Sequence, residues 1–284
     1  IFCVAYEHGL NLPVYQINYS DNFKYKATIP AHIEQYILMI CGNENHKSIN
    51  HFLDDPKVKM IVKNYPEMKN VADNPAEAQE YRTTISVTGH QKFITESEPE
   101  NVITIPLGTC NNYNPSPGNQ NRFPGGFIGQ YTLFRKQKVE NIINSFGKGK
   151  CPYTWRFYSG FGPFVQSKDR KVKSSLDNIT YSRFMSRSEC SFIFSGQSPE
   201  TFRLFEAAAA GCIIVHDILP DIWYYESLPY LPSTEPGASF LDVKEYIEEN
   251  KGYLKTETSK WWQLSASPIA VGQKIAATAK AIGL

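Results

Sequence analysis

The stretch CSFIFSGQSPETFRLFEAAAAGCIIVHD, residues 190–217, decides the fold that the sequence predicts. Its apolar runs at residues 191–195 and 212–216 are typical of two buried strands, and residues 199–210 between them have the spacing of a helix. A strand, a helix and a second strand in this order make one βαβ unit. Such units build parallel sheets with helices on both faces, so the stretch predicts an α/β protein.

The predicted helix begins with polar residues that suit a bound anion. Ser198 is the expected N-cap, and the free N–H groups and dipole of the first turn favour a phosphate. Thr201, Arg203 and Glu206 are polar on a helix that otherwise holds mostly Phe, Leu and Ala, and Arg203 and Glu206 share a face. An arginine neutralises phosphate, and a glutamate accepts two hydrogen bonds from a ribose diol. The alternative is an i,i+3 salt bridge on a solvated helix face.

The order of these residues resembles the nucleotide-sugar half of exostosin-like glycosyltransferases of the GT-B type. That family shows Ser or Thr, then Arg, then Glu-Ala, then Gly-Cys-Ile followed by an apolar pair. This chain matches the order from Thr201 to Ile213, and Ile214 stands where the family usually has Pro. The resemblance is specific over residues 181–229 and weakens toward the N-terminus. Small members that use UDP-sugars, among them xylosyltransferases such as those of chloroviruses, are the nearest comparison.

The resemblance implies two Rossmann-like α/β/α domains that face a central cleft. The first, residues 1–112, would bind the acceptor, and the second, residues 127–265, would bind the nucleotide sugar. Residues 113–126 are the expected linker, because Asn, Pro, Gly and Ser dominate this stretch and no apolar period survives. Residues 266–284 are expected to form a C-terminal helix that packs back on the first domain.

Apolar and amphipathic patterns predict further elements along the chain. Strands are expected at residues 1–6, 57–63, 101–107, 127–133 and 153–159, with a short one at Phe240. Helices are expected at residues 31–40, 76–81, 135–146, 178–186, 243–250 and 268–282. The repeated pairing of strands and helices on both sides of the linker favours two α/β domains.

Three residues of the first domain are candidates for a catalytic base, because loops at the carboxyl ends of parallel strands line the ligand crevice. Glu7 and His8 follow the strand expected at residues 1–6, and Asp73 lies in a loop after the strand expected at residues 57–63. A carboxylate or imidazole there would deprotonate an incoming hydroxyl. The alternatives are water-facing loop residues for Glu7 and His8, and a plain helix cap for Asp73.

Further donor-binding candidates lie outside the central stretch. Arg135 matches the arginine that begins the corresponding helix in exostosin-like sequences, where this part of the second domain faces the donor diphosphate. The alternative for Arg135 is a solvated basic first turn. Ser159 and Gly160 end a predicted strand near the expected position of the nucleotide base, and Arg183 is expected on a helix that faces the donor.

Composition and charge exclude several classes of protein. The 284 residues suit two domains, and a net charge of +1 brings no global attraction to nucleic acid or anionic membranes. No apolar run is long enough to span a bilayer. The six cysteines have no Cys-x-x-Cys spacing, so neither a zinc site nor a disulfide scaffold is indicated. Reduced thiols suit a cytoplasmic enzyme, and the Golgi lumen is the expected location if an upstream anchor has been removed.

Together these features predict a glycosyltransferase that moves a sugar, xylose by the resemblance, from a UDP-sugar to a hydroxyl of an oligosaccharide or glycoprotein glycan. Arg203, Arg135 and the helix N-terminus would stabilise the departing diphosphate in a single, inverting displacement. The sequence has no Asp-x-Asp motif, so metal-independent chemistry without a cofactor is expected. The alternatives are a catalytically inactive glycan-binding protein of the same fold and a nucleotide-sugar epimerase, which would release free sugar without an acceptor.

Overall fold

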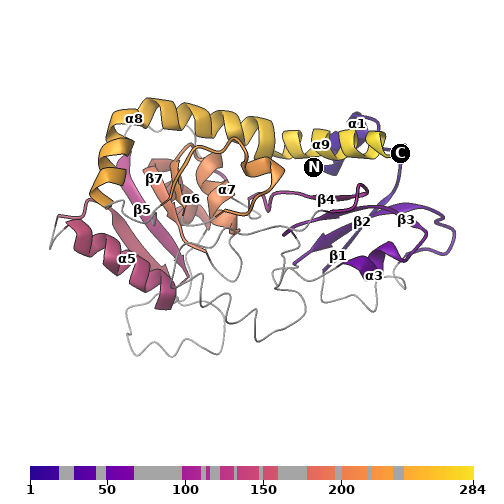
Figure 1. The fold of residues 1–284 in the computed structure, drawn as a ribbon, viewed down its shortest axis with the longest axis horizontal. Coiled ribbons are helices and arrows are strands. Elements are labelled where there is room, and N and C mark those ends of the chain that lie inside the picture. Colours follow the sequence, from indigo (N-terminus) through magenta and orange to yellow (C-terminus); the bar gives the residue numbers. More distant parts are fainter. Residues whose placement is uncertain are drawn as a thin grey trace.

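The computed structural model contains two parallel β-sheets with helices packed against them (Figure 1). It describes residues 1–18, 29–42, 49–66, 98–109, 113–115, 122–130, 133–146, 150–158, 178–195, 200–216, 219–232 and 240–284. The first sheet has the strand order β1-β2-β3-β4, and the second has the order β6-β5-β7-β8-β9. Every one of these strand pairs is parallel, which confirms the α/β class predicted from the βαβ pattern.

The two central strands of the first sheet are largely apolar and are mostly buried on both faces. Its strands are β1 (Val14–Asn18), β2 (Tyr36–Cys41), β3 (Val58–Lys63) and β4 (Val102–Thr104). The helices beside it are α1 (Phe2–Glu7), α3 (Asn50–Leu53) and the C-terminal α9 (Pro268–Ala281). Along β2, Ile37 packs in the core shared with α9, while Leu38 and Ile40 pack in the core shared with α3. The sheet is therefore covered on both faces, because successive side chains of a strand point to opposite sides.

The second sheet has the same construction. Its strands are β5 (Phe123–Gln130), β6 (Thr154–Tyr158), β7 (Ser188–Ile193), β8 (Ile213–His216) and β9 (Tyr230–Pro232). Its helices are α5 (Leu133–Phe146), α6 (Asn178–Arg187), α7 (Phe202–Ala209) and α8 (Phe240–Trp261). Along β8, Ile213 and Val215 pack in one core and Ile214 in the other. The βαβ unit predicted from residues 190–217 is confirmed as β7, α7 and β8.

Helix α8 carries the chain from the second sheet back toward the first, as Figure 1 shows along the top of the view. Ile247 and Leu254 of α8 are buried in the core of the second sheet. Lys251 and Lys255 instead pair with Glu189, at 2.6 and 2.9 Å.

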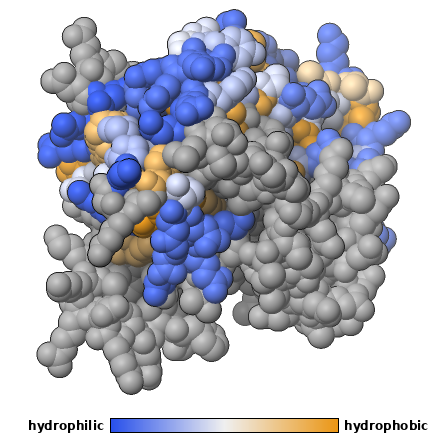
Figure 2. Space-filling model, turned by 60° about the vertical axis from the view of Figure 1, so that its left-hand side comes forward, coloured by the Kyte–Doolittle hydropathy of each residue, from blue (hydrophilic) through white to orange (hydrophobic). Residues whose placement is uncertain are grey.

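Figure 2 shows mostly hydrophilic residues along the upper part of the face that it presents. None of the described helices combines the length and the apolar character needed to cross a bilayer.

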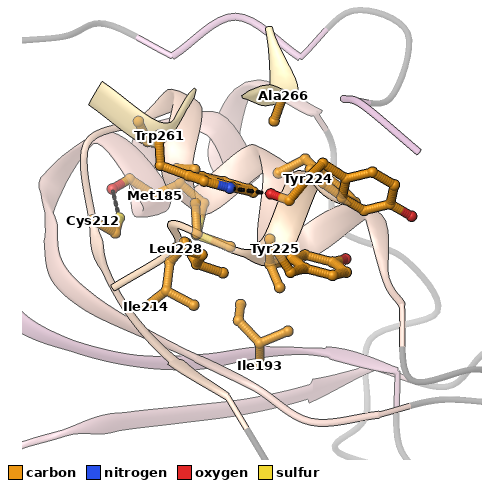
Figure 3. Packing of buried hydrophobic residues seen from close by; sticks show 14 of the residues in the cluster. Met185, Ile193, Cys212, Ile214, Tyr224, Tyr225, Leu228, Trp261 and Ala266 are labelled. Atoms are coloured by element: carbon orange, nitrogen blue, oxygen red, sulfur yellow. Dashed lines mark hydrogen bonds between the residues drawn. The ribbon is translucent and has the colours of Figure 1, made fainter. Parts of the chain in front are cut away.

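An aromatic cluster joins the end of α8 to the core of the second sheet (Figure 3). The indole Nε1 of Trp261 donates a hydrogen bond to the carbonyl oxygen of Tyr224, in the 3-10 turn η2 (Trp223–Tyr225). The ring of Trp261 stacks on Tyr225, with 6.3 Å between the ring centroids and an interplanar angle of 12°. These contacts hold the η2 turn against the sheet, because aromatic stacking and the buried hydrogen bond both depend on its position.

The C-terminal helix α9 packs on the first sheet and on α1. It follows the π-helical turn η3 (Trp262–Ala266), and its Val271 and Ile275 are buried in a core of the first sheet. Gly272 faces α1 so closely that a Cβ atom there would lie 2.7 Å from the Cβ of Val4. Figure 1 shows α1, α9 and both chain termini close together over the first sheet.

Three predicted elements are wrong. Residues 1–6 form helix α1 rather than a strand, because the run IFCVAY suits either period and its neighbour in the fold is helix α9. The helix predicted at residues 31–40 is strand β2 from Tyr36 onward, whose unbroken apolar run YILMI is typical of a strand buried on both faces. Phe240 begins helix α8 rather than forming a short strand. Strands β1 and β9 and helix α3 were not predicted.

The helix predicted at residues 243–250 is part of the longer α8, and six other predicted elements agree in type with ends that differ by a few residues. This holds for β3, β4, β6, α5, α6 and α9. Strand β5 begins at Phe123, inside the linker expected at residues 113–126, and ends at Gln130. The helix predicted at residues 76–81 lies outside the described residues.

Candidate functional site

Arg203, in the first turn of α7, reaches across to the carboxyl end of β5. Its Nε donates a hydrogen bond of 2.7 Å to the carbonyl oxygen of Ile128, and its guanidinium carbon lies 4.8 Å from the centroid of the Phe127 ring. Its Nη1 is buried and has no hydrogen-bond partner among the described residues. A buried guanidinium nitrogen with a free N–H is costly unless an acceptor meets it, so this nitrogen suits an anionic ligand.

Gly129 makes room for this guanidinium. A Cβ atom at position 129 would lie 2.1 Å from Nη2 of Arg203, well inside the contact distance of two heavy atoms. The absence of a side chain on this residue of β5 therefore lets the arginine lie directly over the strand.

Arg135, in the first turn of α5, converges on the same ring from a second helix. It is only 5% exposed, its Nη2 donates to the carbonyl oxygen of Phe194 at 3.2 Å, and its guanidinium carbon lies 5.8 Å from the Phe127 centroid. The alternative of a solvated basic turn is wrong, since the side chain is buried. Two positive charges thus lie within 6 Å of the centroid of one ring toward the carboxyl ends of β5 and β7, the edge at which parallel α/β sheets bind ligands.

The N-terminus of α7 lies beside these arginines. The helix begins at Phe202 with Thr201 as the N-cap residue, and no side-chain hydrogen bond caps it. The Oγ1 of Thr201 is buried without a hydrogen-bond partner in the described part of the chain. The predicted cap, Ser198, lies outside the described residues. The first turn therefore adds the positive end of a helix dipole to the charge of Arg203.

Glu206 is held inside the fold rather than on a solvated face. It is 4% exposed, and its Oε2 accepts a hydrogen bond of 2.6 Å from the hydroxyl of Tyr181. Burial, followed by the charge of Glu206, raises the pKa of Tyr181 well above its usual value, so the hydroxyl stays a donor. The described residues contain no ion pair between Arg203 and Glu206, so the alternative of an exposed i,i+3 salt bridge is wrong.

Of the remaining donor-side candidates, only Arg183 lies among the described residues. Arg183 is exposed on α6, one residue before the buried Phe184. Ser159 and Gly160 lie outside the described residues, as does Asp73 on the acceptor side.

Glu7 and His8 do not follow a strand, so the reason for placing them at the carboxyl edge of the first sheet is wrong. Both are exposed at the end of α1, on the segment that leads into the beginning of β1. The Nε2 of His8 lies 3.5 Å from Nε2 of Gln273 on α9. The helix α1, formed in place of the expected strand, moves these side chains to the surface beside α9.

A polar cluster that the sequence analysis missed lies at the carboxyl ends of β3 and β4. Lys63 and Thr104 are register partners at these ends, and both reach Oε1 of Glu98. The ion pair between Lys63 Nζ and Glu98 measures 2.7 Å, and the hydrogen bond from Thr104 Oγ1 measures 2.5 Å. The available signal was the lysine itself, since a lysine that ends a buried strand needs an acceptor.

Glu200, which belongs to the second half of the chain, lies close enough to this cluster for the charges of Lys63 and Glu98 to act on it. It directly precedes α7, is 3% exposed, and accepts hydrogen bonds at Oε1 from the hydroxyls of Tyr224 at 2.5 Å and Tyr225 at 3.0 Å. Burial raises the pKa of Glu200 to about 7, against the lowering effect of the two tyrosine hydroxyls and of Lys63. The Nε1 of Trp223 donates to the carbonyl oxygen of Thr104 at 2.9 Å, which joins the η2 turn to the first sheet.

Among the described residues, no three His, Cys, Asp or Glu side chains group together as metal ligands would. The described cysteines are all unpaired: Cys3, Cys41, Cys151, Cys190 and Cys212. Metal-independent chemistry stays a prediction.

Comparison with known proteins finds relatives in structure only. No protein-family model matches the sequence, and no curated protein matches it. Sucrose-phosphate synthase from Thermosynechococcus elongatus is similar with a TM-score of 0.51 and 11% identity, over 98% of this chain and 75% of that one. Pneumococcal O-GlcNAc transferase GtfA, solved with UDP and GlcNAc, has a TM-score of 0.45 and 16% identity, over 87% and 52%. MurG of Acinetobacter baumannii has a TM-score of 0.43 and 10% identity, over 87% and 68%.

These similarities concern the fold. The likeness to sucrose-phosphate synthase extends over nearly the whole chain and shows the GT-B fold, which confirms the predicted fold class. The chain spans about half the length of the GtfA chain. The exostosin-like resemblance and the preference for xylose stay predictions.

Proposed function

We propose that this chain is a glycosyltransferase that moves a sugar from a UDP-sugar to a hydroxyl of a glycan. The observation that carries the proposal is the meeting of Arg203 and Arg135 at the carboxyl edge of the second sheet, where Arg203 keeps a buried, unpartnered Nη1 in the described structure. Two guanidinium groups beside a helix N-terminus suit a diphosphate, which carries the leaving-group charge of a nucleotide sugar.

In the proposed reaction, the acceptor oxygen attacks the anomeric carbon as the bond from that carbon to the diphosphate oxygen breaks. The electron pair of the broken bond stays on the diphosphate, so negative charge grows there in the transition state. Arg203, Arg135 and the first turn of α7 stabilise that charge, and they are already held in place by backbone carbonyl groups. The proposed displacement is single, inverting and metal-independent.

The finer features of the proposal come from the resemblance. Uridine is the proposed base, xylose the proposed sugar, and an oligosaccharide or glycoprotein glycan the proposed acceptor. Glu206 is the proposed contact to the ribose, and the hydroxyl of Tyr181 that now occupies its Oε2 would stay beside the ribose or give way to it. A catalytically inactive glycan-binding protein and an epimerase are the outcomes that the test must separate from a transferase.

The first test is calorimetric titration of UDP into the chain and into the variant Arg203→Ala. The variant loses charge-assisted hydrogen bonds worth about 1.5–3 kcal/mol, so its Kd is expected to rise roughly 10- to 100-fold. Arg187→Ala, which removes an exposed arginine at the end of α6, is the matched control and should bind as the parent does. Equal UDP affinity in the parent and in Arg203→Ala would contradict the proposal.

The second test follows product. A transferase releases UDP and forms a new glycoside when a UDP-sugar and glycans are present together. An epimerase that releases free sugar consumes the UDP-sugar and water without any glycan, and yields UDP and the epimer of the sugar. An inactive binding protein leaves the UDP-sugar intact in both mixtures.

A further inference from the structure

The carboxylate of Glu98 is fixed through one of its two oxygens. Lys63 and Thr104 both contact Oε1, from the last residues of β3 and β4. The side chain of Lys63 is 0% exposed and its Nζ also donates to the carbonyl oxygen of Tyr65 at 3.0 Å. Because these donors lie on a rigid sheet edge, they set the direction in which the carboxylate points.

The second oxygen, Oε2, has no hydrogen bond or ion pair with the described residues. The side chain of Glu98 is 20% exposed, and every hydrogen bond or ion pair that it makes with the described residues goes to Oε1. Oε2 is also not among the polar atoms of the described chain that are both buried and without a hydrogen-bond partner. A carboxylate with one oxygen anchored can accept a proton at the other from a hydroxyl that comes within hydrogen-bond reach.

This carboxylate lies next to the segment that leads into the diphosphate site. The charges of Lys63 and Glu98 both act on Glu200, and the η2 turn is tied to Thr104 through Trp223. Glu200 precedes Arg203 by three residues, a stretch that spans at most about 10 Å of chain. The first sheet therefore presents an open carboxylate oxygen near the start of the helix whose arginine faces the leaving group.

We propose that Glu98 is the catalytic residue that takes the proton of the acceptor hydroxyl, with Lys63 and Thr104 as its positioning residues. This inference rests on the proposed transferase function. As the acceptor oxygen bonds to the anomeric carbon, its proton passes to Oε2 of Glu98, and the diphosphate leaves with the electron pair of the broken bond. Glu98 then returns the proton to water, which restores the carboxylate.

The test measures two properties of Glu98→Gln, which keeps the size of the side chain and an oxygen to accept from Lys63 and Thr104. UDP affinity by calorimetry should stay within about twofold of the parent, since the diphosphate site is untouched. Release of UDP from UDP-xylose, with a glycan panel as acceptor, should fall roughly 10²- to 10⁴-fold in kcat. Glu100→Gln removes an exposed carboxylate two residues away and should turn over as the parent does.

Two further measurements distinguish a catalytic role of Glu98 from a purely structural one. The acidic limb of the pH profile of kcat/KM should disappear in Glu98→Gln and persist in Glu98→Asp. Thr104→Val should lower kcat about tenfold with an unchanged KM for the UDP-sugar, and Thr104→Ser, which keeps the hydroxyl, should restore it. These threonine variants leave the ion pair in place, so they test the inference even if Glu98→Gln unfolds.

The outcomes distinguish this inference from the proposed function. A chain that does not bind UDP contradicts both. A chain that binds UDP and turns over, with Glu98→Gln or Thr104→Val as active as the parent, contradicts the assignment of Glu98 and leaves the transferase proposal standing. A chain that binds UDP but never releases it from a UDP-sugar also overturns the assignment, because no proton is then transferred.

Discussion

At the scale of single residues, Gly129 and Arg203 depend on each other. The guanidinium lies where the side chain of any other residue at position 129 would begin, 2.1 Å from an added Cβ. The contact of Arg203 with Phe127 and its hydrogen bond to Ile128 fix the rest of the group. A substitution of Gly129 in β5 should therefore displace the guanidinium group of Arg203, which belongs to α7.

The variant Gly129→Ala is expected to displace the guanidinium and to raise the Kd of UDP about tenfold, because the arginine then loses its present hydrogen bond and position. Calorimetric titration of UDP is the measurement. Gly252→Ala is the control: a Cβ there meets no atom within 4 Å, and removing a glycine from α8 should stabilise the helix by about 0.5–1 kcal/mol without changing affinity. Unchanged UDP binding in Gly129→Ala would count against the diphosphate site.

At the scale of elements, the contact between α1 and α9 closes one face of the first sheet. Gly272 allows the two helices to approach until a Cβ would meet both the Cβ of Val4 and the carbonyl oxygen of Ile1 at 2.7 Å. Ala5 of α1 is completely buried in the same core as Val271 and Ile275. Small residues on both helices thus make this close packing possible.

Gly272→Ala should destabilise the protein by about 1–3 kcal/mol, since the added methyl group meets backbone as well as a side chain. The free energy of unfolding, from urea denaturation, is the quantity to compare. Ala277→Leu adds a larger side chain to the exposed side of the same helix and should leave that free energy within about 0.5 kcal/mol of the parent. Equal stability of Gly272→Ala and the parent would mean that α1 moves away at little cost.

At the scale of the whole molecule, a buried acid lies where the two sheets meet. Glu200 accepts from Tyr224 and Tyr225 and faces the charges of Lys63 and Glu98 from the first sheet. Its pKa is about 7 in the folded chain, against 4.5 for an ordinary glutamate. The folded state therefore holds a proton that the unfolded state releases between these pH values.

The free energy of unfolding should accordingly fall as the pH rises from about 4.5 to 7. Above that range the ionisation of Glu200 should no longer change it. Since each pKa unit corresponds to about 1.4 kcal/mol, the effect amounts to about 3 kcal/mol. Glu200→Gln cannot ionise, so its loss of unfolding free energy between pH 5 and pH 8 should be smaller than that of the parent by about 2–3 kcal/mol.

Urea denaturation at both pH values measures this difference. Glu226→Gln, at an exposed position beyond the η2 turn, should keep the pH dependence of the parent. If Glu200→Gln loses as much stability between pH 5 and pH 8 as the parent does, then Glu200 is ionised in the folded protein and the pH assignment is wrong.

The sequence pointed to the two arginines of the candidate site and not to the polar cluster at the ends of β3 and β4. Arg203 and Arg135 were found because they belong to a local pattern, a helix start that follows a buried strand. Glu98 was missed because its partners Lys63 and Thr104 come from two different strands. Glu7 and His8 were misplaced because a six-residue apolar run suits a helix and a strand equally well.

The sequence by itself determined the βαβ unit over residues 190–217 and, through it, the α/β class, because strand and helix periods and the glycine that ends the helix act within a few residues of each other. Only the tertiary structure decided that residues 1–6 are helical and that Lys63, Glu98 and Glu200 are neighbours. These outcomes depend on which surfaces pack together, and burial at the meeting of two sheets sets the protonation of a carboxyl group that no local pattern distinguishes.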